Sequence, residues 1–532
     1  MASATVAPIP DSGPGISQRR INIIFGALML TMLMAVLDQS IVAPALPTIV
    51  GDLHGLQDMQ WVITAYLLTS TIVVPIYGKL GDLIGRKGLF LFAISIFVIG
   101  SMLSGISQNM GELIMFRGFQ GIGGGGLMIS AQAVLGDIVS PRDRGKYMGP
   151  MMGVLGIGTV LGPLAGGFFT DDASWRWCFY VNVPIGVAAF AVVVMVMRGA
   201  ARAEARPKLD VTGAFLIACI SAVLVFLTSW AGTTYAWVSW QIGALMLAFL
   251  VAVGLFLLAE RRASEPIMPL RLFRSPTFSL TVVIGLFTGF AMFGALAYLP
   301  TFMQMVKGVS ATVSGLLLLP LVAGMMVASI VAGTLISSTG RYKIFAVAGS
   351  AVAAIGMVLL SFMNEHTGYV ENSIFMLVFG AGIGLLMNVL TLAVQNAAPV
   401  RDLGTATSSA NYFRQIGQAV GGAVVGSLFE SRLTSNIAAD IPHGLAAKVP
   451  ATSGLTPGLV HGLPGPLQTA FIHAYATALT PLFLYLAPVL AIAFILALVL
   501  PELPLRTRSS ARAAVAEKQE TGPPPAEAAV AE

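Results

Sequence analysis

The sequence predicts an all-α integral membrane protein with fourteen transmembrane helices. Its 532 residues are 56% hydrophobic and only 10% charged, and a soluble chain of this length would need far more charge to cover its surface. About 20 consecutive apolar residues cross the hydrocarbon core of a bilayer as a helix, and the chain offers such a stretch many times over. Lys and Arg are also distributed unevenly between the predicted loops, as in multi-pass membrane proteins.

Fourteen apolar segments of sufficient length follow one another along the chain. They are expected at residues 22–46, 59–78, 88–107, 111–136, 145–170, 177–197, 210–230, 238–258, 278–303, 312–337, 343–363, 373–397, 406–430 and 473–500. Residues 1–21 lack a small-residue cleavage site after a short apolar core, so the first span is expected to stay uncleaved behind a cytoplasmic tail. The Gly, Pro and Thr content of the longest loop, external residues 431–470, argues against a folded domain, and the tail at residues 501–532 is expected to be disordered.

Positive charge sets the orientation of these spans, because Lys and Arg stay on the cytoplasmic side. With the N-terminus inside, 23 of the 29 Lys and Arg residues lie in cytoplasmic segments, four lie in external loops and two lie within spans. Both termini are therefore expected in the cytoplasm, and the protein in the cell (inner or plasma) membrane. Orientation also accounts for the net charge of +5, so no nucleic acid partner is inferred.

An internal repeat divides the chain into two halves. Residues 78–87 follow the second span and residues 333–341 follow the tenth, both on the cytoplasmic side, with Gly and Arg at matching positions. If each is the loop between the second and third helices of a six-helix half, the halves are residues 22–197 and 278–500. Residues 198–277 then carry an inserted pair of helices, the seventh and eighth. Duplicated halves around a midplane site are common in secondary transporters that work by alternating access.

Five segments carry recognisable motifs in a fixed order: residues 37–47, 78–87, 117–121, 158–167 and 175–184. Together they resemble motifs of the major facilitator superfamily, specifically of its fourteen-helix drug:proton antiporter branch. The resemblance covers nearly the whole chain. It implies two six-helix bundles plus two inserted helices, and a proton-coupled exporter of lipophilic or amphipathic drugs or toxic compounds. It implies protons as the coupling ion and no bound cofactor.

Asp38 is the most informative single residue. A charge inside a span costs about 2.5–3.5 kcal/mol on insertion scales, so such residues usually have a function. Asp38 lies about 16 residues into an outward-running span, or roughly 24 Å along it. Arg117 lies about two turns below the external end of the fourth span, which runs inward, so the two charges are expected at the same depth.

The resemblance implies that Asp38 and Arg117 take part in proton coupling. Burial favours the neutral acid, whereas a nearby guanidinium favours the carboxylate. A cycle in which Arg117 approaches Asp38 in one state and withdraws in another would therefore load and release a proton. The alternative is that Asp38 is a permanent structural partner of Arg117 or of a backbone group.

The cytoplasmic loop after the second span has a different expected role. Asp82 and Arg86 are four residues apart, a spacing at which an acid and a base meet on a helix. The resemblance implies that this loop latches the two halves together in the outward-facing state; the alternative is a solvated turn. The second copy has Ser337 in place of Asp82, which favours the first copy as the latch. The predicted gating residues are Gly78, Asp82, Gly85, Arg86 and Lys87.

Glycines recur every four residues in the fifth span and therefore line one face of the helix. Small residues at this spacing let helix backbones approach closely, and proline can bend a span. The resemblance adds that this face controls proton leak in antiporters. The predicted antiporter motif comprises Gly158, Gly162, Pro163, Gly166 and Gly167.

Polar and aromatic residues within the spans are candidates for a central substrate cavity, although each could equally be an ordinary packing residue. Arg414 could contact a substrate or a carboxylate, or it could extend toward the cytoplasmic interface. The 25 Met residues suit promiscuous apolar ligands because their side chains are flexible. The candidates are Tyr66, Gln120, Tyr298, Phe302, Gln304, Asn388, Gln395 and Arg414.

The sequence favours a transporter over an enzyme, because nucleophiles, bases and metal ligands do not cluster at one depth of the predicted spans. Cys178 and Cys219 indicate no disulfide or metal framework. Asp38 is the only acid expected deep in a span, which suggests one proton per cycle and a neutral or singly charged lipophilic substrate. The alternative is a same-fold exporter of a defined metabolite, such as an endogenous antibiotic, siderophore or lipid. The chain is expected to function as a monomer in the bilayer.

Overall fold

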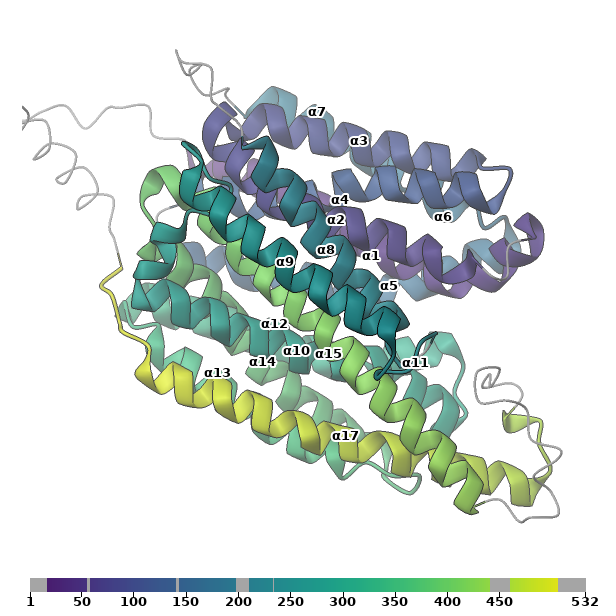
Figure 1. Ribbon diagram of the computed structural model, residues 1–532. Helices are drawn as coiled ribbons and strands as arrows, with labels where there is room; N and C mark the ends of the chain where they lie inside the picture. The colour runs from purple at the N-terminus through teal and green to yellow at the C-terminus, as the bar shows by residue number, and fades with distance from the viewer. Residues whose placement is uncertain are drawn as a thin grey trace, which may run out of the picture.

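A computed structural model of the full chain describes residues 17–54, 58–139, 143–197, 210–232, 234–440 and 460–505. The described residues are almost entirely helical, and the long helices lie roughly side by side in two groups (Figure 1). The first half of the chain forms one group and the second half forms the other.

The N-terminal group has a continuous apolar core, to which Leu28, Phe90, Phe97 and Leu127 contribute fully buried side chains. Its last long helix follows a short helical turn, and Val181 between the two has a helical backbone conformation. The helices of this group are α1 (Gln18–Leu53), α2 (Met59–Ile84), α3 (Arg86–Ile106), α4 (Met110–Ile138), α5 (Arg144–Asp172), α6 (Trp177–Tyr180) and α7 (Asn182–Val196).

The C-terminal group surrounds a second core that includes Phe302, Phe379, Leu386 and Phe483. Two short 3₁₀ helices, η2 (Leu270–Arg274) and η3 (Val400–Asp402), lie near the helix ends on the side that the distribution of Lys and Arg predicts to be cytoplasmic; the two sides are called cytoplasmic and external below in this predicted sense. The helices of this group are α10 (Pro276–Lys307), α11 (Ala311–Leu317), α12 (Leu319–Thr339), α13 (Lys343–Ser361), α14 (Tyr369–Ala397), α15 (Leu403–Asp440) and α17 (Gly465–Val499).

The helices α8 (Val211–Trp230) and α9 (Trp240–Arg262) lie across the junction of the two groups (Figure 1). Helix α8 contacts the second group through a hydrogen bond of 2.9 Å between the hydroxyls of Ser221 and Tyr412. Helix α9 presents apolar side chains outward, with Leu247 64% exposed and Leu250 60% exposed. An outward apolar surface of this kind fits contact with lipid.

Within the described residues, twelve helices are long and apolar enough to cross a membrane. The predicted count of fourteen is therefore not confirmed, because α4 and α15 fall outside this set. Helix α4 contains the run Gly123–Gly126, and its glycines lower its hydropathy. They also permit close packing: a Cβ at Gly123 would overlap the backbone of α3 at Phe97, and one at Gly125 would overlap Ser70 on α2.

The predicted external loop at residues 431–470 is shorter than expected. Helix α15 continues to Asp440 and α17 begins at Gly465, so both ends of the predicted loop are helical. These helix ends extend because they still pack on each other: Leu433 and Ile437 are buried, and a hydrogen bond of 3.1 Å joins the side chains of Asn436 and Thr477. Residues 441–459, most of the N-terminal tail and residues 506–532 lie outside the described residues.

Candidate functional site

The carboxylate of Asp38 lies fully buried in the N-terminal group, where three side chains donate hydrogen bonds to it. Arg117 Nη1 on α4 lies 2.6 Å from Asp38 Oδ2. Gln120 Nε2, one turn further along α4, and Asn182 Nδ2 at the start of α7 each lie 2.8 Å from Asp38 Oδ1. Asp38 is 0% exposed and Arg117 is 1% exposed, so this is an ion pair shielded from solvent.

Arg117 has further partners that fix its orientation. Its Nη1 also donates to Gln120 Oε1 at 2.8 Å, and its Nε donates to the carbonyl of Val62 at 3.3 Å. The guanidinium lies over the ring of Tyr66, with its central carbon 4.4 Å from the ring centroid. A cation over an aromatic face is stabilised by the ring quadrupole, and more strongly where water is excluded. The site therefore holds both charges with most of their hydrogen-bonding groups satisfied.

This arrangement defines what the site can do chemically. Removing one partner of a buried ion pair costs about 3–5 kcal/mol, since the remaining charge is left uncompensated. Arg117, Gln120 and Asn182 together supply the countercharge and the hydrogen bonds that the buried carboxylate of Asp38 receives.

Asn182 was not among the residues predicted from the sequence. It lies in the segment 175–184, at the start of α7, and its amide also donates to Ser101 Oγ at 3.0 Å. A fully buried Asn inside an apolar segment was the available signal. Tyr66 and Gln120, predicted to line a substrate cavity, instead contact the Asp38–Arg117 pair.

The glycines of the predicted antiporter motif pack α5 against α1, the helix that carries Asp38. A Cβ at Gly162 would overlap Ser40, one at Gly166 would overlap the carbonyl of Ile41, and one at Gly158 would lie 2.9 Å from Val36. The close approach lets Ser40 Oγ donate to the carbonyl of Gly158 at 3.0 Å.

The other two predicted motif residues differ from these three glycines. Gly167 has nothing within 4 Å of the position of a Cβ, so it does not belong to the contact with α1. Pro163 lies inside α5, where it removes a backbone donor.

Asp82 joins the two halves on the predicted cytoplasmic side. Its Oδ1 accepts from the backbone N–H of Gly404 at 3.0 Å, and its Oδ2 accepts from the backbone N–H and the hydroxyl of Thr405 at 2.7 Å and 2.8 Å. All three hydrogen bonds come from the N-terminus of α15, where unpaired N–H groups and the helix dipole favour a negative charge. Arg86 donates to Asp82 and also to Asp137 Oδ2 at 3.0 Å.

The remaining predicted gating residues fall into two groups. Gly78 packs directly against Ser408 across the halves, where a Cβ would overlap that side chain, and Gly85 adopts a φ of 95° between α2 and α3. Lys87 remains within the N-terminal group, where its Nζ donates to the carbonyls of Val194 and Met197 at 2.8 Å and 2.5 Å.

A second contact between the halves brings α5 against α12. Gly145 and Gly333 meet backbone to backbone, so that a Cβ on either residue would overlap the carbonyl of the other. Further along α5, Gly149 faces Ile330 and Gly153 faces Met326. The sequence analysis missed this contact, although Gly145, Gly149 and Gly153 form a separate run at four-residue spacing, which was the available signal.

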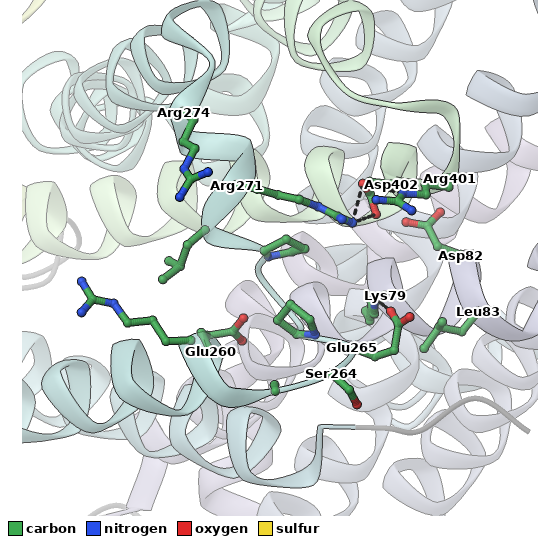
Figure 2. Close-up of a pocket in the computed structure, with 15 residues that line it drawn as sticks. Lys79, Asp82, Leu83, Glu260, Ser264, Glu265, Arg271, Arg274, Arg401 and Asp402 are labelled. Atoms are coloured by element: carbon green, nitrogen blue, oxygen red, sulfur yellow. Dashed lines mark hydrogen bonds and ion pairs between the residues drawn. The ribbon is translucent and has the colours of Figure 1, made fainter. Parts of the chain in front are cut away.

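The linker from α9 to α10 adds two ion pairs beside these contacts (Figure 2). Lys79 Nζ on α2 lies 2.5 Å from Glu265 Oε2, and Arg271 Nη2 lies 2.9 Å from Asp402 Oδ2 just before α15. The linker and these helix ends surround a cytoplasmic cavity of about 840 Å³. The hydrogen bond from Lys79 holds the pKa of Glu265 below its ordinary value of 4.5.

Tyr298 lies in an aromatic cavity of about 210 Å³ near the external ends of α10, α15 and α17. Its ring centroid is 5.3 Å from that of Phe429, which in turn is 5.0 Å from that of Tyr475. Of the predicted substrate residues, Tyr298 is placed in an apolar cavity large enough for a small aromatic group.

The other candidates in the C-terminal group are dispersed. Phe302 is 0% exposed in the core. Gln304 Nε2 donates to Ser314 at 3.0 Å near the external end of α10, and Asn388 donates to Ser329 on α12.

Gln395 belongs instead to the cytoplasmic contact between the halves. Its Oε1 accepts from Arg144 Nη1 at 2.9 Å, and its Nε2 donates to Thr407 Oγ1 at 3.2 Å. The structure therefore does not bring the predicted substrate residues around one cavity.

Arg414 does not extend toward the cytoplasmic interface. Its guanidinium remains between α14 and α15, donating to Asn411 Oδ1 and lying 3.4 Å from Met387 Sδ. Asn411 Nδ2 in turn donates to Gln132 Oε1 on α4 at 3.0 Å, which links this side chain to the other half of the protein.

The fold and this site define a multi-pass membrane transporter rather than an enzyme, and comparison with known proteins gives its family. The sequence matches the model of the Major Facilitator Superfamily over residues 28–422. It is 44% identical over 503 residues to an uncharacterised MFS-type transporter of Mycobacterium tuberculosis, covering 94% of this chain and 73% of the relative.

A second relative, the multidrug transporter protein MdtP of Bacillus subtilis, is 39% identical over 401 residues, which is 75% of this chain and 74% of the relative. The fold is similar to that of the proton:xylose symporter XylE, with a TM-score of 0.61 at 13% identity over 93% of this chain and 99% of that one. This chain belongs to the major facilitator superfamily.

Proposed function

We propose that the protein is a proton-coupled antiporter that exports lipophilic or amphipathic compounds by alternating access. The observation that carries this proposal is the buried Asp38–Arg117 ion pair, with its 2.6 Å contact inside the membrane-spanning part of one half. The name of the Bacillus subtilis relative supports multidrug substrates. The proton is the coupling ion, and no cofactor is required. A monomer in the bilayer suffices, because both halves of the transporter belong to one chain.

The proposal extends to topology and location. All fourteen predicted spans cross the bilayer, since α4 and α15 are long enough, at 29 and 38 residues, and pack among the apolar helices. Both termini lie in the cytoplasm of the cell, and the protein resides in the inner or plasma membrane. The uneven distribution of Lys and Arg supports this orientation.

The structure represents the state that is closed toward the cytoplasm, in this proposal. Two contacts hold the cytoplasmic ends of the two halves together. The carboxylate of Asp82 accepts hydrogen bonds from the N-terminus of α15, and the backbone of Gly145 packs against that of Gly333. In the opposite state these contacts separate, Asp38 releases its proton to the cytoplasm, and the substrate enters from the cytoplasm. Because proton release and substrate release occur in different states, the proton gradient can drive export.

Proton movement in proteoliposomes tests the proposed function. Vesicles that contain the purified chain are given a pH gradient, and the internal pH is followed as the neutral dye Nile red is added. Proton flux that requires the dye, and dye accumulation that requires the gradient, would support antiport. Dye movement without any associated proton flux would contradict it.

The Asp82→Asn variant tests the cytoplasmic latch. Asparagine keeps the shape but loses the charge that the N-terminus of α15 and Arg86 attract, so the closed state should lose about 1–2 kcal/mol. We expect turnover in the same vesicles to slow about 5- to 30-fold while its dependence on pH is preserved. A variant with normal turnover would show that the contact is only structural.

The Glu265→Gln variant tests the linker. An exposed ion pair contributes about 0.2–1 kcal/mol, so we expect a cysteine placed at Ser408 to react with a maleimide up to about fivefold faster in this variant. The pair is intact above the ordinary pKa of Glu265, because that pKa is lowered, and is lost only as pH falls through the lowered value. Its contribution should therefore be constant between about pH 6 and pH 8.

A same-fold exporter of a defined metabolite is the second candidate. The charged group of Arg414 favours it, since a fixed charge in the C-terminal group would select among substrates. Competition assays distinguish the two functions: unrelated dyes should inhibit one another in a multidrug exporter but not in a transporter of one metabolite.

A further inference from the structure

The guanidinium of Arg414 lacks a matching negative charge. Its Nη1 faces only the weak acceptor Met387 Sδ at 3.4 Å, and its Nη2 donates to the neutral amide oxygen of Asn411. Its Nε is buried without a hydrogen-bond partner. None of the ion pairs among the described residues includes Arg414. By contrast, Arg117 in the other half has a carboxylate at 2.6 Å.

The position of Arg414 makes this unusual. It lies eleven residues into α15, about 16 Å from the cytoplasmic start of that helix. An Arg that merely obeyed the positive-inside rule would extend to the interface. This side chain instead remains inside the bundle, where an unpaired cation is costly and usually marks a pathway or a ligand site.

A small cavity lies beside the guanidinium. Its volume is about 20 Å³, and its polar lining consists of Thr281, Thr391, Thr407 and Asn411 with Arg414. That volume admits roughly one small polar group, on the scale of a bound water molecule. Arg414 is the cationic residue in this lining, so the cavity matches one negative charge.

The threonine hydroxyls that line the cavity already donate hydrogen bonds to backbone carbonyls. Thr281 donates to the carbonyl of Thr277 at 2.6 Å, and Thr407 donates to the carbonyl of Leu403 at 2.7 Å. Hydroxyls that already donate to their own helix offer only lone pairs to a ligand. The unused donor that faces an incoming acceptor is therefore the guanidinium.

The cavity lies directly behind the closed cytoplasmic contacts. Thr407 is held by Gln395, which accepts from Arg144 on the other half at 2.9 Å. Asn411 reaches Gln132 across the same junction at 3.0 Å. Separation of these contacts would open the cavity toward the cytoplasm first, which is the side from which an exported compound enters.

We propose that Arg414 binds the carboxylate of a monoanionic amphipathic substrate, whose apolar body lies in the space that opens between the halves. The inference rests on the proposed function for the direction of transport. A planar guanidinium binds a carboxylate through two parallel hydrogen bonds. A dianionic phosphate would leave one charge unmatched, and a cation would be repelled.

Binding of three probes with the same apolar body tests the proposal. The detergent-solubilised full chain is titrated with 1-naphthaleneacetate, its neutral amide and 2-(1-naphthyl)ethylamine. We expect the wild-type protein to bind the carboxylate about 10- to 100-fold more tightly than the amide, as for a charge-assisted hydrogen-bonded pair. In Arg414→Gln the preference should vanish while amide binding is unchanged, and Arg414→Lys should retain part of it.

The Asn411→Asp variant provides a second test that keeps the guanidinium. An aspartate at this position supplies an internal carboxylate to Arg414, so the carboxylate probe should lose its advantage while the amide binds as before. Size-exclusion chromatography checks that each variant is folded. The proposal is wrong if the wild type binds the carboxylate no better than the amide, if the carboxylate does not bind at millimolar concentration, or if the preference survives in Arg414→Gln or in Asn411→Asp.

The Asp38→Asn variant separates this proposal from the proposed function. The preference for the carboxylate should persist in Asp38→Asn even though proton coupling is lost. If instead the wild type shows no proton coupling, the binding preference can still be measured, so each failure is recognised separately.

Discussion

Replacing Asp38 with Asn is expected to abolish uphill transport while substrate binding remains. Asparagine retains an oxygen that can accept from Gln120 or Asn182, but it cannot exchange a proton with solvent. A gradient of one pH unit supplies about 1.4 kcal/mol per proton, which sustains about tenfold accumulation. The variant should show a gradient-driven accumulation ratio of about one, measured with Nile red in proteoliposomes.

Two comparisons make this result interpretable. Asp38→Asn leaves the buried Arg117 without its partner, so the folded fraction must be measured, and Asp38→Glu should restore part of the coupling. Asp58, an exposed acid at the external start of α2 whose side chain caps no N–H, provides a matched control. Asp58→Asn should transport as the wild type does. Full coupling in a folded Asp38→Asn protein would assign the proton carrier to another residue.

Replacing Gly333 with Val is expected to hold the protein open toward the cytoplasm. Even the first carbon of the new side chain would overlap the backbone of Gly145, and backbone cannot move aside as a flexible side chain can. Overpacking of this kind costs about 1–3 kcal/mol or more, so the closed state should become about 100-fold rarer and transport should fall accordingly. A spin-label distance between the cytoplasmic ends of α5 and α12 should lengthen.

Gly254→Val provides the matched control for this substitution. Gly254 lies on the outward face of α9 with nothing within 4 Å of the position of a Cβ. The same change should therefore leave both the spin-label distance and transport near their wild-type values. Normal transport by Gly333→Val would show that the halves need not approach this closely during the cycle.

The sequence was most informative where it placed a charged residue in an apolar span, because burying a charge without a partner costs free energy. A carboxylate and a guanidinium at the same expected depth in two apolar spans had few ways to be satisfied other than each other, and the structure places them 2.6 Å apart. The antiporter glycines were informative for a similar reason, because a face without side chains requires a close neighbour. Their spacing did not identify that neighbour, which is α1.

Residues with several acceptable environments could not be placed from the sequence. Gln120, Tyr66 and Gln395 are equally suited to a cavity or to a buried hydrogen-bond network, and the structure places all three in networks. Helix α5 carries two successive faces of small residues, one that contacts α12 and one that contacts α1. The spacing of the glycines alone does not show which helix each face contacts.

The two edges of the closed cytoplasmic junction respond to different conditions. The edge formed by α2 and α15 carries ion pairs with half-exposed members, Glu265 at 46% and Arg271 at 47%, whereas the edge formed by α5 and α12 is held by uncharged backbone. Salt screens exposed charges and leaves backbone packing almost unaffected. Rising ionic strength should therefore weaken the edge formed by α2 and α15 more than the edge formed by α5 and α12.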